Sequence, residues 1–317
     1  MLKKKVLIFG ITGQDGSLLA QLLLKKKYNV FGYSRNIKKN KNLKKLKIEK
    51  KVKLIQGNYY NYKLFEQLIK KNKFHEIYFF AGQTLPKISN QIRIATLLSN
   101  IVPVFNILDI LQKNRIKSRF FNASSCEIFG SSKKSFRENS SKNPNTVYGL
   151  SKLISLELVR FYRIKFGIQC FSGILFHHES TLRNDKFVIK KIVSSLIKFK
   201  KKNKPYKIKF GNINANKDWG WAPEYIKIIH KIINSKNLDD YIIATGKSNS
   251  VKSVIEYAFK KMGYDWKKYI TIADNLKRDK TEIYNSKANN NKLFKSLKFK
   301  PKKNVFDVVD KLLNGHK

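Results

Sequence analysis

A glycine-rich turn close to the start of the chain constrains its fold most strongly. The apolar run Val6–Phe9 leads directly into Gly10-Ile11-Thr12-Gly13-Gln14-Asp15-Gly16, and a helical pattern begins at Ser17. Glycines between a strand and a helix let the backbone turn tightly and approach a pyrophosphate, which the helix N-terminus then attracts. The spacing is GxxGxxG, whereas the commonest dinucleotide-binding turn has GxGxxG. We expect a dinucleotide site here, and the alternative is an ordinary glycine-rich loop.

Short apolar runs alternate with longer helical patterns along the chain. The predicted strands are Val6–Phe9, Val30–Tyr33, Val52–Gln56, Glu76–Phe80, Phe120–Ser124, Gln169–Phe176 and Tyr241–Thr245. The predicted helices are Ser17–Lys27, Tyr62–Lys71, Asn100–Asn114, Val147–Phe166, Pro223–Ile233, Val251–Met262 and Val305–Leu313. Strands that are apolar throughout are typical of a parallel sheet covered by helices on both faces. The pattern predicts an α/β fold: a doubly wound parallel-sheet (Rossmann-like) domain with a smaller C-terminal substrate lobe.

The alternation of strands and helices also suggests how the chain divides. We expect residues 1–176 plus 213–248 to form the dinucleotide-binding domain and residues 177–212 plus 249–317 to form the smaller lobe. From Phe176 to Gly211 the sequence reads as a polar, charged interruption. The Lys- and Asn-rich runs 38–53 and 289–291 are predicted as exposed loops.

The charge of the chain is strongly positive. Lys and Arg together number 67 against 21 Asp and Glu, which gives a formal net charge of +46. This balance is typical of proteins that bind nucleic acid or anionic membranes. However, the lysines are scattered from Lys3 to Lys317 among Asn and Ile. We interpret the charge as a codon bias toward AT-rich sequence and expect no nucleic-acid partner, and a basic nucleic-acid-binding protein on the same fold is the alternative.

The compartment is suggested by the cysteines and by the lengths of the apolar runs. Cys126 and Cys170 cannot form a disulfide framework. The apolar run after the first lysines is too short for a secretory signal, and no uncharged apolar stretch reaches the ~18–20 residues that cross a bilayer. His177 and His178 would point to opposite faces of a strand, without a third ligand at a recognisable spacing, so we expect no metal. We therefore expect a cytoplasmic protein with no membrane partner.

Residues suited to proton transfer cluster in two short segments. Tyr148 and Lys152 stand four residues apart, which places both on one face of a helix. An ammonium beside a phenol lowers the pKa of the phenol, so that the phenol can exchange a proton near neutral pH. Ser124, Ser125 and Glu127 follow a predicted strand at its carboxyl end, where active groups of such sheets lie. The alternative for Glu127 is a capping or ion-pairing acid.

The end of the second predicted strand bears on the choice of cofactor. A carboxylate there would bind the ribose 2′-hydroxyl of NAD. This sequence instead has Arg35, which suits the 2′-phosphate of NADP. We expect NADP, with NAD as the alternative if Arg35 is only a surface cation.

Together these segments resemble the extended short-chain dehydrogenase/reductase family, and within it the branch of GDP-mannose 4,6-dehydratases. The resemblance covers nearly the whole chain and rests on residues 10–17, 122–130, 173–180, 211–220 and 241–246. The pieces Gln14-Asp15 and Asp218-Trp219-Gly220 are distinctive for this branch.

The resemblance implies an internal oxidation and reduction of a hexose. Tyr148, assisted by Lys152, would take the proton of the 4-hydroxyl while C4 gives hydride to the cofactor, and Ser125 would hydrogen-bond O4. Glu127 would then remove the C5 proton and protonate the departing 6-hydroxyl, after which hydride returns to C6. The implied substrate is GDP-mannose and the implied product is GDP-4-keto-6-deoxymannose.

The turn and the resemblance together give the full set of predicted binding residues. Those expected to bind the cofactor are Gly10, Thr12, Gly13, Gln14, Asp15, Gly16, Arg35, Asn58, Ala81, Tyr148 and Lys152. Those expected to bind the substrate are Ser124, His177, Glu179, Lys191, Lys217 and Arg278. His177 stands where the family has an amide, Lys217 where it has an arginine, and Asn58 where it has an acid. These departures put the exact sugar nucleotide in question.

The resemblance also implies self-association. Family members associate through the helices that correspond to Asn100–Asn114 and Val147–Phe166, so we expect a homodimer or homotetramer. A second enzymatic interpretation is an NAD(P)-dependent epimerase or decarboxylase of another nucleotide sugar, which would share Tyr148 and Lys152 and could also share Glu127.

Overall fold

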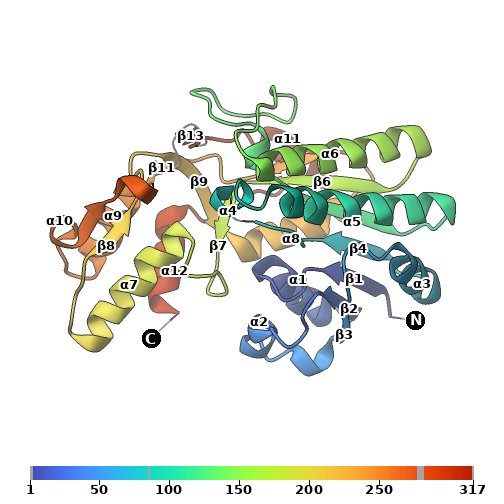
Figure 1. Ribbon diagram of the computed structural model, residues 1–317, viewed down its shortest axis with the longest axis horizontal. Coiled ribbons are helices and arrows are strands. Elements are labelled where there is room, and N and C mark those ends of the chain that lie inside the picture. Colours follow the sequence, from blue (N-terminus) through green and yellow to red (C-terminus); the bar gives the residue numbers. More distant parts are fainter. Residues whose placement is uncertain (1–2, 85, 277–281, 316–317) are drawn as a thin grey trace. The chain divides into compact units, whose positions relative to one another are not determined.

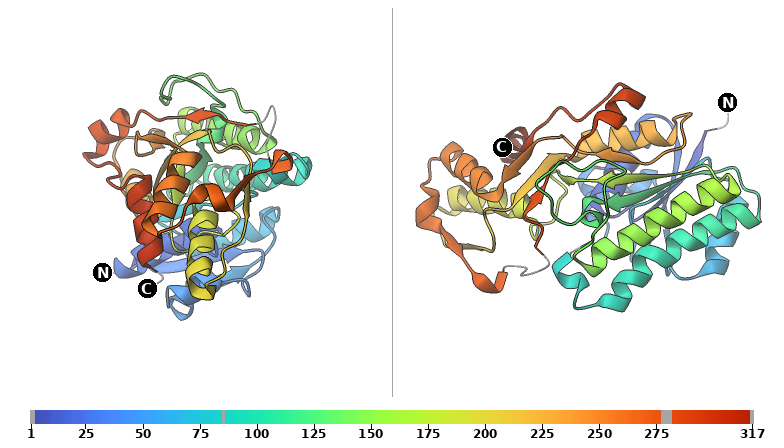
Figure 2. Two further views of the ribbon diagram at one scale, coloured as in Figure 1. Left: turned by 90° about the vertical axis from the view of Figure 1, so that its left-hand side faces the viewer. Right: turned by 90° about the horizontal axis from the view of Figure 1, so that it is seen from above.

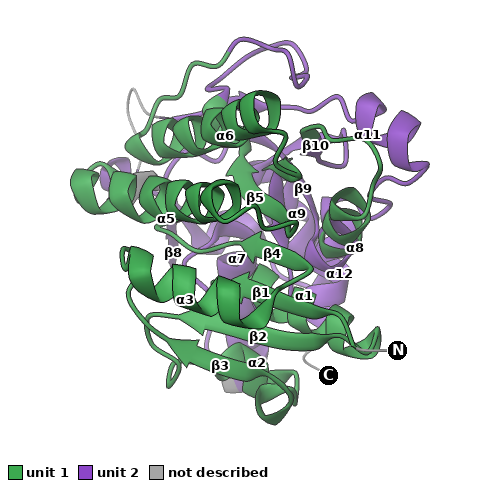
Figure 3. Cartoon of the chain, turned by 90° about the vertical axis from the view of Figure 1, so that its right-hand side faces the viewer, with its two compact units in different colours: residues 1–128, 142–175, 226–241 green, residues 129–141, 176–225, 242–317 purple. Residues whose placement is uncertain are grey.

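A computed structural model of the chain describes residues 3–84, 86–276 and 282–315. Its contacts divide the chain into two compact units (Figure 3): unit 1 contains residues 1–128, 142–175 and 226–241, and unit 2 contains residues 129–141, 176–225 and 242–317. The predicted domain limits differ from these units mainly at residues 129–141, 213–225 and 242–248, which the contacts assign to unit 2.

The large sheet runs in the order β10-β6-β5-β4-β1-β2-β3, and the strand pairs from β6 to β3 are all parallel (Figure 1). Its strands are β1 (Lys5–Phe9), β2 (Asn29–Ser34), β3 (Lys53–Gln56), β4 (Glu76–Phe79), β5 (Arg119–Ser125), β6 (Cys170–Leu175) and β10 (Tyr241–Ile243). The strands predicted from the sequence are all present, with ends that differ by a few residues. β4, β5 and β6 are buried along almost their whole length because helices cover both faces, whereas edge strand β3 is partly exposed.

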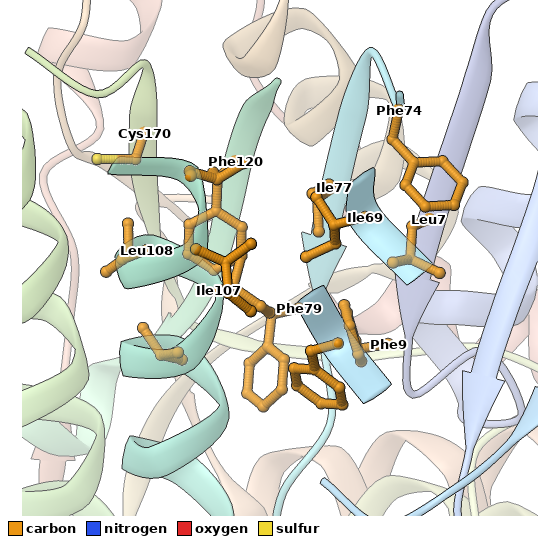
Figure 4. Close-up of a cluster of buried hydrophobic side chains, with 14 of the residues drawn as sticks. Leu7, Phe9, Ile69, Phe74, Ile77, Phe79, Ile107, Leu108, Phe120 and Cys170 are labelled. Carbon is orange, nitrogen blue, oxygen red and sulfur yellow. The ribbon is translucent and has the colours of Figure 1, made fainter. Parts of the chain in front are cut away.

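The helices of unit 1 lie on the two faces of this sheet. α3, α5 and α6 lie on one face and α1 and α8 on the other (Figure 3). Their bounds are α1 (Gln14–Lys25), α3 (Tyr62–Asn72), α5 (Arg93–Lys113), α6 (Val147–Phe166) and α8 (Ala222–Ile233), of which α8 belongs to unit 1 from residue 226 onward. α5 and α6 run side by side (Figure 2). Between them and the sheet lies a cluster of buried apolar side chains that includes Phe79, Ile107, Leu108 and Phe120 (Figure 4).

Helix α5 is long and apolar enough to cross a membrane, judged by length and composition alone. It is the one such helix in the part of the chain that the structure describes, and 56% of its most apolar window is buried. Its buried side packs on the sheet and on α6, as the core helix of a globular domain does.

Unit 2 is built from shorter elements. They are β7 (His177–Glu179), α7 (Val188–Lys202), β8 (Ile208–Phe210), β9 (Asn216–Trp221), β11 (Ser248–Ser250), α9 (Val251–Lys261), α10 (Trp266–Tyr269), β12 (Ile270–Ile272), β13 (Asn285–Ser286), α11 (Asn291–Leu297) and α12 (Val305–Asn314). β9 pairs with β7, β11 and β13, and β8 pairs with β12. A second core forms where α7, α9 and α12 pack together, as their fully buried residues Ile192, Val254 and Val308 show.

Three predictions about irregular segments were wrong. The charged stretch after Phe176 contains α7, whose apolar residues recur with helical period beneath its lysines. The lysine run 38–53 contains a short helix, α2 (Lys41–Lys45), with Leu43 fully buried, and α11 starts within the asparagine run 289–291. Another short helix, α4 (Pro86–Ser89), precedes α5, and single 3-10 turns, among them η2 (Cys126–Ile128), complete the chain.

Candidate active site and cofactor turn

The glycine-rich turn after β1 is shaped by close backbone contacts. Gly10 has a φ of +79°, and a Cβ there would lie 2.8 Å from the amide nitrogen of Ala81, just beyond β4. A Cβ on Gly16 would lie 2.4 Å from the carbonyl oxygen of Gly10. Both positions therefore require glycine, and the turn brings the predicted cofactor residues Gly10, Gly16 and Ala81 together.

The same turn leads directly into helix α1. Gly13 occupies the N-cap position without a side-chain cap, and its carbonyl accepts the amide of Ser17 at 3.1 Å. The Gln14 side chain donates to Asp15 at 3.0 Å, and the Thr12 hydroxyl lies 3.4 Å from that of Ser34 at the end of β2. A helix N-terminus preceded by glycines attracts an anion such as a pyrophosphate.

The positions of Arg35 and Asn58 extend this site along the ends of β2 and β3. Arg35 is exposed, and its guanidinium lies 5.7 Å from the ring centroid of Tyr59. Asn58 is exposed, and its main-chain oxygen accepts the hydroxyl of Tyr33 at 2.9 Å. β1 has β2 on one side and β4 on the other, so the order of the strands reverses at β1. The carboxyl end of β1 is therefore the switch point at which such sheets bind ligands.

The carboxyl end of β5 presents the predicted acid and two hydroxyl groups. Ser124 and Ser125 are its last residues, and Glu127 follows in the turn η2. The Ser125 Oγ accepts the amide of Glu127 at 3.3 Å. Glu127 is only 3% exposed, so its carboxyl group lies within the protein rather than on its surface.

The ammonium of Lys152 is buried beside the tyrosine ring. Lys152 Nζ donates to the main-chain oxygen of Ala123 at 2.9 Å and lies 5.9 Å from the ring centroid of Tyr148. The Ser124 hydroxyl donates to the carbonyl oxygen of Lys152 at 3.3 Å, which ties β5 to α6. Burial lowers the pKa of Lys152 to about 8, because desolvation disfavours the charged form.

The start of α6 is fixed by residues that the sequence reasoning did not identify. The N-cap Thr146 accepts the amide of Gly149 at 2.9 Å. Ser89 Oγ accepts the amide of Tyr148 at 3.3 Å, and Asn90 Oδ1 accepts that of Val147 at 3.2 Å. The last two contacts span more than 50 residues of sequence, so no local pattern announces them.

Gly149 allows α6 to approach the η2 turn closely. A Cβ at this position would lie 2.6 Å from the main-chain oxygen of Glu127. Because Gly149 directly follows Tyr148, the close contact brings the phenol-bearing turn of α6 next to the turn that carries Glu127. In the sequence, the glycine that directly follows Tyr148 is the one local signal of this close contact.

In unit 2, three predicted substrate residues lie on one small sheet. His177 pairs in register with Trp219, and the two rings are 6.0 Å apart. Glu179, on the same strand, is 2% exposed, and its Oε1 lies 3.6 Å from Nε of Arg183. Lys217 is 6% exposed in β9, between β11 and β13.

Of the three other predicted substrate residues, Ser124 lies at the end of β5 in unit 1 and Lys191 lies on α7, outside this small sheet. Lys191, on α7, donates to the main-chain oxygen of Lys209, and its ammonium lies 4.6 Å from the ring centroid of Phe210 on β8. Partial burial lowers the pKa of Lys191. Arg278 lies outside the described residues.

A buried carboxyl group of unit 2 organises the turn after β10. Asp218 accepts the hydroxyl of Thr245 at 2.6 Å and the amides of Thr245 and Gly246 at 3.0 and 2.7 Å. Burial raises its pKa to about 6 although these hydrogen bonds lower it. No group of three or more His, Cys, Asp or Glu side chains suited to a metal ion occurs within residues 3–84, 86–276 and 282–315.

The sequence and the fold were compared with known proteins. The sequence profile of the GDP-mannose 4,6 dehydratase family matches residues 7–312. GDP-mannose 4,6 dehydratase 1 of Arabidopsis thaliana is 31% identical over 313 residues, which cover 95% of this chain and 86% of the relative. GDP-mannose 4,6 dehydratase of Homo sapiens is 32% identical over 270 residues, or 81% of this chain and 72% of the relative.

The fold has a matching solved structure. It is similar to that of a dTDP-glucose 4,6-dehydratase from Bacillus anthracis in complex with NAD, with a TM-score of 0.85 and 17% identity over 99% of this chain and 96% of that one. The profile match covers nearly all of the sequence, and the Gly-rich turn, the η2 glutamate and the Tyr148–Lys152 pair fall within it. The chain belongs to the GDP-mannose 4,6-dehydratase family.

Proposed function

We propose that this protein converts GDP-mannose to GDP-4-keto-6-deoxymannose by internal hydride transfer and elimination of water. The observation that carries the proposal is the edge of unit 1 where Glu127, Tyr148 and Lys152 are all buried near the end of β5. Such an elimination requires two groups: a base that takes the hydroxyl proton while the ketone forms, and a carboxyl group that removes the C5 proton and protonates the departing hydroxyl. An epimerase requires only the first.

The oxidation half of the reaction is assigned to Tyr148, Lys152 and Ser125. Tyr148 takes the proton from the 4-hydroxyl of the hexose, and the ammonium of Lys152, 5.9 Å from its ring centroid, stabilises the phenolate that accepts it. The Ser125 hydroxyl, at the end of β5, hydrogen-bonds O4 and orients the sugar. These side chains fix the position at which a proton leaves the substrate.

The elimination half is assigned to Glu127. A ketone at C4 acidifies the proton on C5, so a carboxylate can remove it. The same carboxyl group, now protonated, gives a proton to the departing 6-hydroxyl, which leaves as water. Burial of Glu127 excludes bulk water from the carboxyl group that acts in both steps.

A nicotinamide dinucleotide, when bound, accepts hydride from C4 and returns it to C6. The glycines of the turn fit such a group. A Cβ at Gly10 or Gly16 would clash with neighbouring main-chain atoms, so only glycine allows the tight turn that a dinucleotide requires. The relative from Bacillus anthracis was solved with NAD. We assign NADP to this chain because Arg35 stands exposed at the end of β2 and supplies a cation for a 2′-phosphate. The test is the ratio of dissociation constants for NADP⁺ and NAD⁺, which we expect to favour NADP⁺ about tenfold and to fall to about one in Arg35→Ala.

For the nucleotide part of the substrate we propose the unit 2 residues His177, Glu179 and Lys217. They lie on the paired strands β7 and β9, and both charged side chains are almost fully buried. A lysine gives the phosphates a point charge rather than the two-pronged contact of an arginine. Lys191 and Arg278 complete the proposed set.

The function is tested with purified protein, GDP-mannose and NADP⁺. We expect a base-labile 4-keto product that absorbs in alkali, without net reduction of the cofactor. Glu127→Gln keeps the shape of the side chain and removes the base, so water elimination should fall at least ~10³-fold while cofactor affinity stays within twofold of wild type. Ser140→Ala, a change of a partly exposed residue outside the site, serves as the control.

Two outcomes would overturn this assignment. Turnover of UDP-sugars alone would exclude GDP-mannose as the substrate. Wild-type elimination by Glu127→Gln would remove the carboxyl group from the mechanism and favour an epimerase or decarboxylase.

We also propose that the chain forms a homo-oligomer through α5 and α6. Large apolar side chains are exposed on both helices: Ile94 is 73% exposed, Phe161 51% and Ile164 74%. Large apolar side chains exposed on two helices that run side by side are suited to a protein interface. Phe161→Glu with Ile164→Glu should yield a monomer by light scattering at micromolar concentration, whereas a wild-type monomer would refute the interface. We propose a cytoplasmic location, which is supported by Cys126 and Cys170 both being buried thiols outside any disulfide.

A further inference from the structure

A cavity of about 460 Å³ lies in unit 1, at the opposite end of the parallel strands from the candidate active site. Its walls come from the last turn of α3, the segment that leads into β4, the end of α5 and the segment that leads into β5. The cofactor turn, Ser125 and Glu127 all belong to the carboxyl ends of the strands, whereas this cavity belongs to their amino ends. The volume lies within the range of small-molecule sites, ~300–1,000 Å³.

The inner wall of the cavity is apolar. It includes Ile69, which is fully buried, Phe74, which is 3% exposed, and Ile116, which is partly buried. Ile69 and Phe74 belong to the main hydrophobic cluster (Figure 4), and Ile116 packs against that cluster. The Ser118 hydroxyl is already bonded to the main-chain oxygen of Phe74, so it ties two walls together rather than facing a ligand. An occupant would therefore rest its own apolar body on the core of unit 1.

Three lysines give the opening of the cavity an excess of positive charge. Lys70, Lys73 and Lys117 line the cavity, are exposed, and form no ion pair within the described ranges. His75 also lines the cavity, and its Nδ1 accepts the main-chain amide of Lys5 at 3.3 Å, so we do not count it as a charge. The nearby carboxylate of Glu66 accepts the amide of Asn114 at 3.0 Å. The charge of the opening therefore complements an anion.

Lysines near the C-terminus of a helix are often explained by the helix dipole. This explanation covers only some of the lysines that line the cavity. Lys70 is in the last turn of α3 and Lys73 is its C-cap, where cations offset the negative helix end. Lys117 is in no helix, because it lies in the segment between α5 and β5, two residues before that strand begins. Residues from two separate connections thus surround the same opening.

We propose that this cavity binds a small amphiphilic anion, with its apolar body against Ile69, Phe74 and Ile116 and its single carboxylate or phosphate head among Lys70, Lys73 and Lys117. This site is separate from the one that carries the proposed function. Its test uses binding alone, so its failure leaves the dehydratase proposal untouched.

The probes are octanoate and octyl phosphate, measured by titration calorimetry and thermal shift on the full-length chain without cofactor. Both anions should bind and raise the midpoint of unfolding, while octylamine, with the same chain and opposite charge, should bind at least tenfold more weakly. Stronger binding of octyl phosphate than of octanoate would identify a phosphate head as the natural one, and the reverse order would identify a carboxylate. Lys70→Gln/Lys73→Gln/Lys117→Gln should weaken the binding of both anions at least tenfold.

The matched control removes the same charge elsewhere. Lys51→Gln/Lys63→Gln/Lys71→Gln changes three lysines that do not line the cavity and should alter affinity by less than twofold. Ile116→Trp fills the apolar part and should abolish binding even though the lysines remain. Equal loss in the two triple variants, equal binding of octylamine, or full binding by Ile116→Trp would overturn the proposal.

Discussion

The two compact units stabilise a buried aspartate in different ways. In unit 1, Asp240 accepts Nε of Arg160 at 2.7 Å, the guanidinium of Arg163 at 2.9 and 3.0 Å, and the amide of Ser172 at 2.9 Å. In unit 2, the donors to Asp218 among the described residues are neutral, namely the hydroxyl and main-chain amides of the turn after β10. Both carboxyl groups are at most 1% exposed.

The pKa values of these two buried aspartates are shifted in opposite directions. Burial raises the pKa of Asp240, but the bonds and charges of Arg163 and Arg160 outweigh it, so the pKa of Asp240 lies below its usual value. Burial raises the pKa of Asp218 to about 6, because neutral donors do not offset the lost hydration of the charge. Cationic partners keep a buried carboxylate ionised at neutral pH, whereas neutral donors alone leave it close to protonation.

The largest expected effect is that of removing the carboxylate of unit 1. Asp240→Ala leaves Arg160 and Arg163 without their shared buried partner, so we expect the free energy of unfolding to fall by ~3–5 kcal/mol in denaturant titrations. Glu157→Ala is the control, because it removes a half-exposed partner of the same Arg160 and should cost less than ~1 kcal/mol. Equal losses in the two variants would show that burial does not matter here.

The next largest effect is the change with pH in the contribution of Asp218, in unit 2, to the free energy of unfolding. The pKa of Asp218 is higher in the folded chain than in the unfolded one, so its contribution to stability is largest below pH 4 and is lost as the pH rises through about 6. Between pH 4 and 7 this loss should be about 2 kcal/mol. Asp240 behaves oppositely, because its stabilisation is lost only when acid protonates it below its usual range.

The measurement is the free energy of unfolding of wild type and Asp218→Asn at several pH values. The difference between the two proteins should change by about 2 kcal/mol between pH 4 and 7, with wild type relatively more stable in acid. A constant difference would mean that Asp218 titrates normally.

A smaller effect is expected for the buried ammonium of unit 1. The pKa of Lys152 is lowered to about 8 by burial, so its charged form destabilises the fold below pH 8, and the cost disappears as the pH rises toward 10.5. Lys152→Met should therefore raise the stability at pH 7 by about 1–2 kcal/mol, after the loss of the bond to Ala123. Dehydratase activity should fall at least ~10²-fold.

The control for this variant is Lys165→Met, an exposed lysine on the same helix. It should change neither stability nor activity appreciably. We expect Lys152 to lower the stability of the fold while it supports activity. A loss of stability in Lys152→Met would contradict this, because it would show that the ammonium stabilises the folded state.

The smallest expected effect compares two helix ends. In unit 1, α6 ends at Gly167 with φ +65°, whereas in unit 2, α11 ends at Lys298 with φ +50°. A lysine is strained in this left-handed region and a glycine is not. Lys298→Gly should stabilise the protein by about 0.5–1 kcal/mol in thermal unfolding, and a destabilisation would show that the lysine side chain makes a compensating contact.

The catalytic edge of unit 1 was predictable because its signals are local. The turn at Gly10 to Gly16 lies within seven residues, and the four-residue spacing of Tyr148 and Lys152 determines their shared helix face. Their supports were not predictable. Ser89, whose hydroxyl accepts the amide of Tyr148, comes from a four-residue helix 59 positions earlier.

Unit 2 was harder to predict because its strands are short and its helices are rich in lysine. The two residues of β13 carry no usable alternation, and their pairing with β9 depends on the tertiary fold. In α7 the positive charges concealed the periodic apolar residues that reveal an amphipathic helix. Unit 1 also contains a contact that could not be predicted: the pairing of Asp240 with Arg160 links positions 80 apart, a distance over which sequence spacing gives no information.

The hydrogen bond from the ammonium of Lys152 to the carbonyl of Ala123 has an evolutionary consequence. Every amino acid presents the same main-chain oxygen, so exchanges at position 123 leave the acceptor intact. The position of the lysine therefore does not depend on which side chain occupies position 123.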